Sequence, residues 1–130
     1  MTGSLVLDSE GLSKLYRKDR FVTLLVEQAA EQDIRVMCTV MTLMEADDPR
    51  IQVGRVAWIS SRIDVHEITR DLADAGIALQ RRHNLHGHKY AIDATLAAVA
   101  RAAPGPVTVV TSDPEDLQQL CGPAVRVVKI

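Results

Sequence analysis

The chain has 130 residues, of which 47% are hydrophobic, enough for one domain whose core needs no disulfides or structural metal. A net charge of -2 at pH 7 argues against a protein that coats DNA, and 3% aromatic residues are too few for the stacking platforms of single-strand binding modules. The chain opens without a basic segment and no apolar stretch approaches about 18 residues, so we expect a soluble, cytoplasmic protein with no membrane segment.

Strand-length apolar runs recur along the chain, and most are rich in β-branched residues and bounded by structure breakers. They cover residues 5–7, 35–40, 63–68, 107–111 and 125–130. The segments between them place apolar residues at helical spacing, as at Phe21, Leu24 and Leu25 and again at Leu72 and Leu79. Strands that alternate with helices predict an α/β fold, a three-layer α/β/α sandwich around a central parallel five-stranded sheet.

Prolines mark the ends of several elements. Asp48–Pro49 and Asp113–Pro114 each predict a helix N-cap followed by a proline in the first turn. Residues 104–106, Pro-Gly-Pro, predict the end of a helix before the fourth apolar run. No internal repeat or linker interrupts this pattern, so we interpret residues 1–130 as a single domain.

Three side chains have structural interpretations. Cys38 and Cys121 match neither a zinc-binding pattern nor a disulfide framework, and we expect both to be buried free thiols. Trp58 lies on an apolar helical face, which favours a place in the core or in a dimer interface over base stacking.

Four acids occupy positions that are unusual on structural grounds. Asp8 and Asp113 each follow an apolar run, at the carboxyl ends of strands, where open α/β sheets bind ligands. Asp93 interrupts an alanine-rich helix, where a charge is costly unless it is paired or metal-bound. Glu45 is the only acid in its segment and is expected on a short helix that follows a strand.

Gathering these carboxylates would require a cation. Two unit charges about 4 Å apart repel by roughly 4 kcal/mol at an effective dielectric constant near 20. Oxygen-only ligand sets select hard ions such as Mg²⁺ or Mn²⁺, which bind through carboxylates and substrate phosphates. The pattern therefore indicates metal-assisted hydrolysis of phosphodiester bonds.

Around these acids the sequence resembles a known family. The matching segments are residues 5–9 (LVLDS), 43–45 (LME), 88–94 (HKYAIDA) and 111–117 (TSDPEDL). In this order they resemble the PIN domain family, and in particular the VapC-like toxin ribonucleases of bacterial type II toxin–antitoxin systems. The resemblance covers the whole chain.

The resemblance implies a sheet of strand order 3-2-1-4-5, metal-dependent endoribonuclease activity, a homodimer and, for a toxin, inhibition by a cognate antitoxin. It also implies that Asp8, Glu45, Asp93 and Asp113 are the catalytic residues and bind Mg²⁺ or Mn²⁺ directly or through water. The family allows Ser9 to hydrogen-bond a metal-bound water; the alternative is that Ser9 is the N-cap of the first helix.

Three further residues near these acids have open roles. Glu10 departs from the family pattern, in which many relatives carry a small residue, and it either tunes metal binding or faces solvent. Asp116 either joins the metal ligands or stabilises a helix N-terminus through the helix dipole. Thr111 is expected to pack in the core and to hydrogen-bond to the site.

Two basic stretches, residues 14–20 and 81–89, are close in sequence to Asp8 and Asp93 and are candidates for gripping an RNA backbone. The candidate RNA-binding residues are Lys14, Arg17, Lys18, Arg81, Arg82 and Lys89. The alternative is that each stretch is a solvated face. His86 and His88 are interpreted as part of a polar turn, not as metal ligands.

Two rival functions fit the same pattern less well. One is a catalytically silent PIN-fold module that binds RNA or protein without turnover. The other is a receiver-like signalling domain, which needs a phospho-acceptor aspartate at the end of its third strand. Asp64 begins the third apolar run instead of ending it, so this alternative ranks low.

Overall fold

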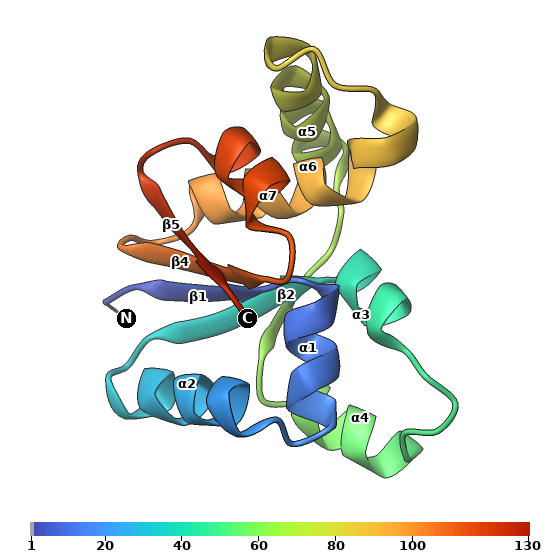
Figure 1. The fold of residues 1–130 in the computed structure, drawn as a ribbon, viewed down its shortest axis with the longest axis vertical. Helices are drawn as coiled ribbons and strands as arrows, with labels where there is room; N and C mark the ends of the chain where they lie inside the picture. The colour runs from blue at the N-terminus through green and yellow to red at the C-terminus, as the bar shows by residue number, and fades with distance from the viewer. Residues whose placement is uncertain (1) are drawn as a thin grey trace.

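A parallel five-stranded sheet forms the middle layer of the protein, in the order β3-β2-β1-β4-β5 (Figure 1). The computed structural model describes residues 2–130. The strands are β1 (Ser4–Leu7), β2 (Arg35–Thr39), β3 (Asp64–His66), β4 (Val107–Thr111) and β5 (Val125–Lys129). The fold class and strand order expected from the sequence are thus confirmed. Receiver domains of the flavodoxin-like type have the order 2-1-3-4-5, so this order excludes that alternative.

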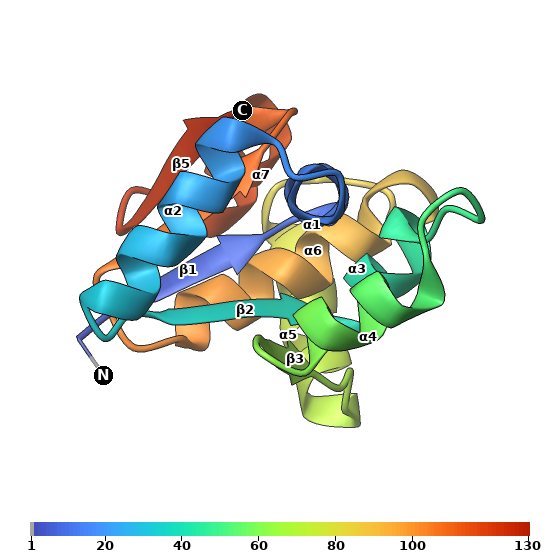
Figure 2. The same cartoon turned by 90° about the horizontal axis from the view of Figure 1, so that it is seen from below.

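Helices cover both faces of the sheet. They are α1 (Ser9–Tyr16), α2 (Arg20–Glu31), α3 (Val40–Ala46), α4 (Val53–Ser60), α5 (Arg70–Arg82), α6 (Gly87–Ala102) and α7 (Pro114–Cys121). Figures 1 and 2 show α1 to α4 on one side of the sheet and α5 to α7 on the other. Within the described residues no helix is long and apolar enough to cross a membrane.

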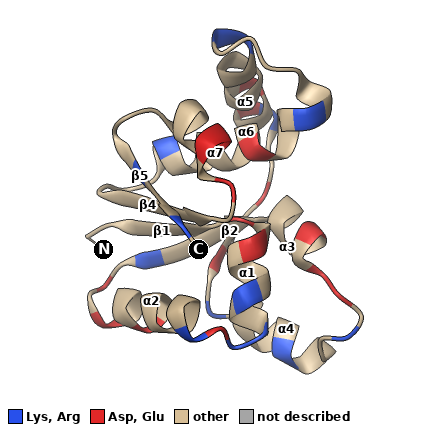
Figure 3. Ribbon diagram, viewed as in Figure 1, with Lys and Arg blue, Asp and Glu red and all other residues tan. Residues whose placement is uncertain are grey.

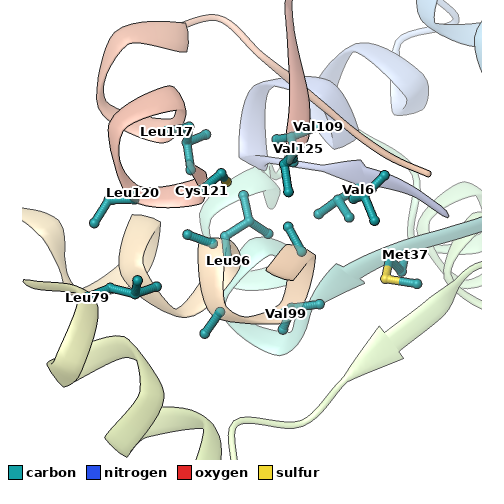
Figure 4. Close-up of a cluster of buried hydrophobic side chains, with 14 residues drawn as sticks. Val6, Met37, Leu79, Leu96, Val99, Val109, Leu117, Leu120, Cys121 and Val125 are labelled. Atoms are coloured by element: carbon teal, nitrogen blue, oxygen red, sulfur yellow. The ribbon is translucent and has the colours of Figure 1, made fainter. Parts of the chain in front are cut away.

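The central strands β1 and β2 alternate their side chains between two hydrophobic cores. Val6 points into the core beneath α5, α6 and α7, where Leu96 and Leu120 are also buried (Figure 4). Its neighbours Leu5 and Leu7 point into the core beneath α1 to α4. Successive side chains of a strand face opposite ways, so a strand buried on both faces is apolar at every position. This accounts for the unbroken apolar runs in the sequence.

Several boundary predictions need correction. The third apolar run was expected to form a strand over residues 63–68, but β3 keeps only three residues, because β2 pairs with it only from Asp64 to His66. Val40, expected at the end of the second strand, begins α3 instead. Asp48 does not cap a helix, because α4 begins later and has Gln52 at its N-cap.

Other local predictions agree with the structure. Asp113 lies at the N-cap position of α7 and Pro114 is its first residue. Cys38 and Cys121 are both buried free thiols. The core alternative for Trp58 is wrong, because its side chain is 53% exposed.

Candidate active site

The ends of β1 and β4 lie side by side and bring two of the expected acids together. Leu7 pairs with Val110 in the sheet, and the Asp8 N–H donates to the Val110 carbonyl at 3.2 Å. The Asp8 carboxylate caps α1 by accepting the Gly11 N–H at 2.8 Å. A side chain on Gly11 would come within 3.2 Å of Val110 Cγ2, so glycine allows this close approach of α1 to β4.

Thr111 connects the two acids at the strand ends. It is fully buried, and its Oγ1 accepts the Asp113 N–H at 3.0 Å. The same hydroxyl lowers the pKa of Asp8 and so offsets part of the rise that burial causes. The Asp113 carboxylate makes no capping bond to α7, so its oxygens are available to another ligand. Thr111 therefore lies in the core and hydrogen-bonds to the backbone of Asp113.

Glu45 reaches the same region from α3. Burial first and the nearby Asp8 second raise the pKa of Glu45, and the Ser9 hydroxyl lowers it. The N-cap alternative for Ser9 is wrong, because Asp8 occupies that position and Ser9 is the first residue of α1.

Asp93 is the most perturbed acid of the group. Burial on α6 is the largest cause that raises its pKa to about 6, followed by the negative charges of Asp116, Glu45, Asp8 and Asp113. Five carboxylates from four separate segments of the sequence therefore share one electrostatic field. Figure 3 shows acidic segments of α1, α3, α6 and α7 around the ends of β1 and β4.

These carboxylates form a shared field without forming a compact cage. Among residues 2–130, no three His, Cys, Asp or Glu side chains form a group ready to hold a metal ion. Mutual repulsion of unscreened carboxylates keeps such groups apart, and each close pair costs several kcal/mol. The donor set is all oxygen, so it fits Mg²⁺ or Mn²⁺, and the raised pKa of Asp93 marks a site that a cation would stabilise.

Glu10 and Lys89 lie beside this acidic site. Glu10 forms an ion pair with Arg17 at 3.1 Å. The Lys89 Nζ lies 5.1 Å from the centre of the Tyr90 ring. A hydrogen bond to Tyr90 is the largest cause that raises the pKa of Lys89, and the charges of Asp116 and Asp113 add to it. Tyr90 was not singled out in the sequence, and only its position after Lys89 could have indicated it.

The other candidate RNA-binding residues lie on two elements. Lys14 is on α1, and Arg17 and Lys18 follow its last residue. Arg81 and Arg82 form the end of α5, and both are exposed. The structure therefore brings Lys89 next to the carboxylates and leaves Arg81 and Arg82 one loop away from it.

A second concave surface was not predicted from the sequence. It is a groove of about 1200 Å³ between α2, α4 and the first residues of β2 and β3, and Leu24, Ile34 and Trp58 are among its apolar lining residues. Arg62 stacks on Trp58, with its guanidinium 4.3 Å from the ring centre. The available signal was the apolar face of residues 51–59, which the sequence assigns equally well to core or interface.

Solved structures share this fold at low sequence identity. VapBC2 from Rickettsia felis, bound to a DNA fragment from its promoter, matches with a TM-score of 0.70 and 11% identity over 98% of both chains. FitAB bound to an IR36 DNA fragment matches with a TM-score of 0.63 and 16% identity, over 96% of this chain and 94% of that one. FitAcB from Neisseria gonorrhoeae matches with a TM-score of 0.59 and 16% identity over 95% of both chains. No family model matches the sequence, and no curated protein matches it.

Proposed function

We propose that this PIN-like chain is a Mg²⁺- or Mn²⁺-dependent endoribonuclease and the toxin of a toxin–antitoxin pair. The observation that carries the proposal is the shared field of Asp8, Glu45, Asp93, Asp113 and Asp116 at the carboxyl ends of β1 and β4. Structural likeness to VapBC2 and FitAB supports the fold on which the proposal rests. The proposal treats residues 1–130 as one domain and includes homodimerisation.

The carboxylates are oriented by their own neighbours. The Gly11 N–H holds the Asp8 carboxylate at 2.8 Å, and the hydroxyls of Thr111 and Ser9 lower the pKa values of Asp8 and Glu45, so both carboxylates have neighbours that favour their charged forms. When bound, a divalent ion supplies an activated water and neutralises charge on the phosphate. Asp8, Glu45, Asp93 and Asp113 would hold it, with Asp116 available as a fifth oxygen donor.

An antitoxin-like partner is part of the proposal, and the groove between α2 and α4 supports it. The groove has apolar walls, and five basic against three acidic side chains line it, so its charge favours an amphipathic segment with acidic residues. Trp58→Ala should leave RNA cleavage intact and weaken inhibition by a co-expressed antitoxin, because exposed aromatic anchors carry much of the binding energy in such contacts. If the antitoxin inhibited Trp58→Ala as strongly as it inhibits the wild type, the groove would not be the antitoxin-binding surface.

The nuclease proposal is tested by incubating purified protein with total RNA, with and without Mn²⁺, beside Asp8→Asn and Asp71→Asn. Asparagine at position 8 can still cap α1, so this variant removes charge and keeps the fold. Asp71 is an exposed residue at the start of α5 and provides a charge-matched control. We expect cleavage only with metal, retained in Asp71→Asn and lost in Asp8→Asn.

The catalytically silent alternative is favoured by one observation, the lack of a compact metal-binding group among the described residues. It predicts that the wild-type protein binds RNA and leaves it intact at millimolar Mn²⁺. Cleavage at the same rate by wild type and Asp8→Asn would contradict both functions as stated and indicate a contaminating nuclease.

A further inference from the structure

The hairpin of α5 and α6 ends in a strongly basic tip, which we call the α5–α6 arm and define as residues 81–89. Figure 1 shows α5 and the following loop standing away from the sheet. The arm holds two arginines, one lysine and three histidines and contains no carboxylate. The acids that flank it along the chain are Asp74 and Asp93.

The arm is held in a fixed position relative to the acidic site. Leu85 packs against the core beneath α5, α6 and α7, and its N–H donates to the Gln80 carbonyl at 2.8 Å. Asn84 takes the left-handed conformation, with φ of 55°, that such a tight turn needs. The two helices pack against each other at Gly76, where a Cβ atom would make an ordinary van der Waals contact of 3.5 Å with the backbone of Ala94.

The arm differs from the basic stretch at the end of α1 because its two arginines have no internal partner, whereas Arg17 is paired with Glu10. Four other guanidinium groups form ion pairs, namely Arg17 with Glu10, Arg35 with Asp64, Arg50 with Asp48 and Arg70 with Asp74. Arg55 donates to the carbonyls of Tyr16 and Leu15. Within residues 2–130, no hydrogen bond or ion pair involves the side chains of Arg81 or Arg82, and both are exposed. Their charge is therefore available to an external anion.

The arm also leads to the acids. Lys89 is the last basic residue of the arm and lies one helical turn before Asp93, about 6 Å along the axis of α6. The negative charges of Asp116 and Asp113 help to raise the pKa of Lys89, so its ammonium group lies near both carboxylates. A chain of phosphates that follows the arm from Arg82 to Lys89 therefore ends at the acidic site.

We propose that the α5–α6 arm is the surface that binds the phosphate backbone of single-stranded RNA and guides it to the acidic site from one side. This inference rests on the proposed ribonuclease function and assigns its substrate contact. It gives the α1 stretch a lesser role, because Arg17 is paired with Glu10 and Lys18 lies along the groove. The scarcity of exposed aromatic residues on the arm implies contact with phosphates more than with bases.

The test is the binding of a fluorescein-labelled, mixed-sequence 12-nucleotide RNA in EDTA, measured by anisotropy at several salt concentrations. Arg81→Gln/Arg82→Gln removes two charges from the arm. Each phosphate contact on a single strand contributes about 0.7 to the slope of log K against log salt, so the slope should become shallower by about 1.4 and the affinity fall roughly 25-fold at 0.1 M salt.

Two matched variants separate charge on the arm from charge in general. Arg81→Lys/Arg82→Lys keeps the charge and should bind nearly as the wild type does. Arg126→Gln/Lys129→Gln removes two exposed charges from the edge strand β5 and should leave the affinity within about twofold. Circular dichroism melts of all variants check that they are folded.

The outcomes distinguish failure of the proposed RNA-binding role of the arm from failure of the proposed ribonuclease function. If the arm and β5 variants lost affinity equally, or if the arm variant bound RNA as tightly as the wild type, the α5–α6 arm would not be the RNA-binding surface. Cleavage of RNA by the wild-type protein would still support the proposed ribonuclease function. A wild-type protein that neither binds nor cleaves RNA would overturn both.

Discussion

Replacing Asp93 with asparagine should stabilise the metal-free protein while it disables the proposed nuclease. Asp93 lies half-buried on α6, and burial together with four neighbouring carboxylates raises its pKa from 3.8 to about 6. The ionised form is therefore disfavoured in the folded protein. Asparagine has a similar helix propensity and carries no charge, so the substitution removes this cost without changing the backbone.

The size of the effect follows from the pKa. Each pKa unit corresponds to about 1.4 kcal/mol, so the upper limit is about 3 kcal/mol. Solvent reaches part of the side chain and screens these charges, which reduces the expected gain to about 1.5 kcal/mol. For a domain of this size that gain raises the melting temperature by roughly 5 °C.

The stability difference between Asp93→Asn and the wild type should depend on pH. The folded protein binds the Asp93 proton more tightly than the unfolded chain does, so this residue costs nothing at low pH and destabilises the protein as the pH rises toward and past about 6. Asp93→Asn should therefore melt higher than wild type at pH 7.5 in EDTA and nearly equal to it at pH 4.

Thermal unfolding of wild type, Asp93→Asn and Asp71→Asn at both pH values measures this. The exposed Asp71 lies in the first turn of α5, where loss of its charge should cost a few tenths of a kcal/mol. An Asp93→Asn protein no more stable than wild type at pH 7.5, or equally stabilised at pH 4, would refute the electrostatic reasoning.

Three further predictions concern the same site. Thr111→Val should lower the free energy of unfolding by about 1–3 kcal/mol in urea titrations, because it leaves the Asp113 N–H without its acceptor, whereas Thr108→Val on the same strand should cost less; equal costs would show that the hydroxyl is not structural. Millimolar Mg²⁺ should raise the melting temperature of the wild type but not that of Asp93→Asn. At a Mg²⁺ concentration 100 times the dissociation constant, the gain in the free energy of unfolding is about 2.7 kcal/mol. A wild-type melting temperature that Mg²⁺ does not change would argue against a preformed site. Ser9→Ala removes the hydrogen bond that lowers the pKa of Glu45, so the acid limb of the pH–rate profile should move to higher pH, and an unmoved limb would separate Glu45 from the rate.

The sheet and the placement of the acids were predictable because both depend on local sequence patterns. Strands buried on both faces are apolar at every position, and Asp8 and Asp113 follow two such runs. The pairing of charges could not be predicted in the same way. Arg17 pairs with Glu10, seven residues earlier on α1, whereas Asp74, seven residues before Arg81, pairs with Arg70 instead. A charge pattern alone treats the two arginines alike.

The predictions of the helix starts were wrong, and the groove was missed, for related reasons. Ser9 and Asp8 are both good N-cap residues, and the choice between them depends on where β1 ends. Asp48–Pro49 has the composition of a cap, but the carboxylate accepts the Arg50 N–H at 2.9 Å in a turn that precedes α4. Trp58 has apolar neighbours at helical spacing, but it lines the open groove between α2 and α4, and this groove leaves its ring exposed.

Asp8 and Asp93 should respond differently if the chain lost its activity during evolution. Asp8 caps α1, so selection for folding alone would keep aspartate, asparagine or serine at that position. Asp93 destabilises the helix that carries it, and nothing in folding would preserve it once the ion was no longer needed. Among descendants of this chain, position 93 would therefore report retained catalysis far better than position 8.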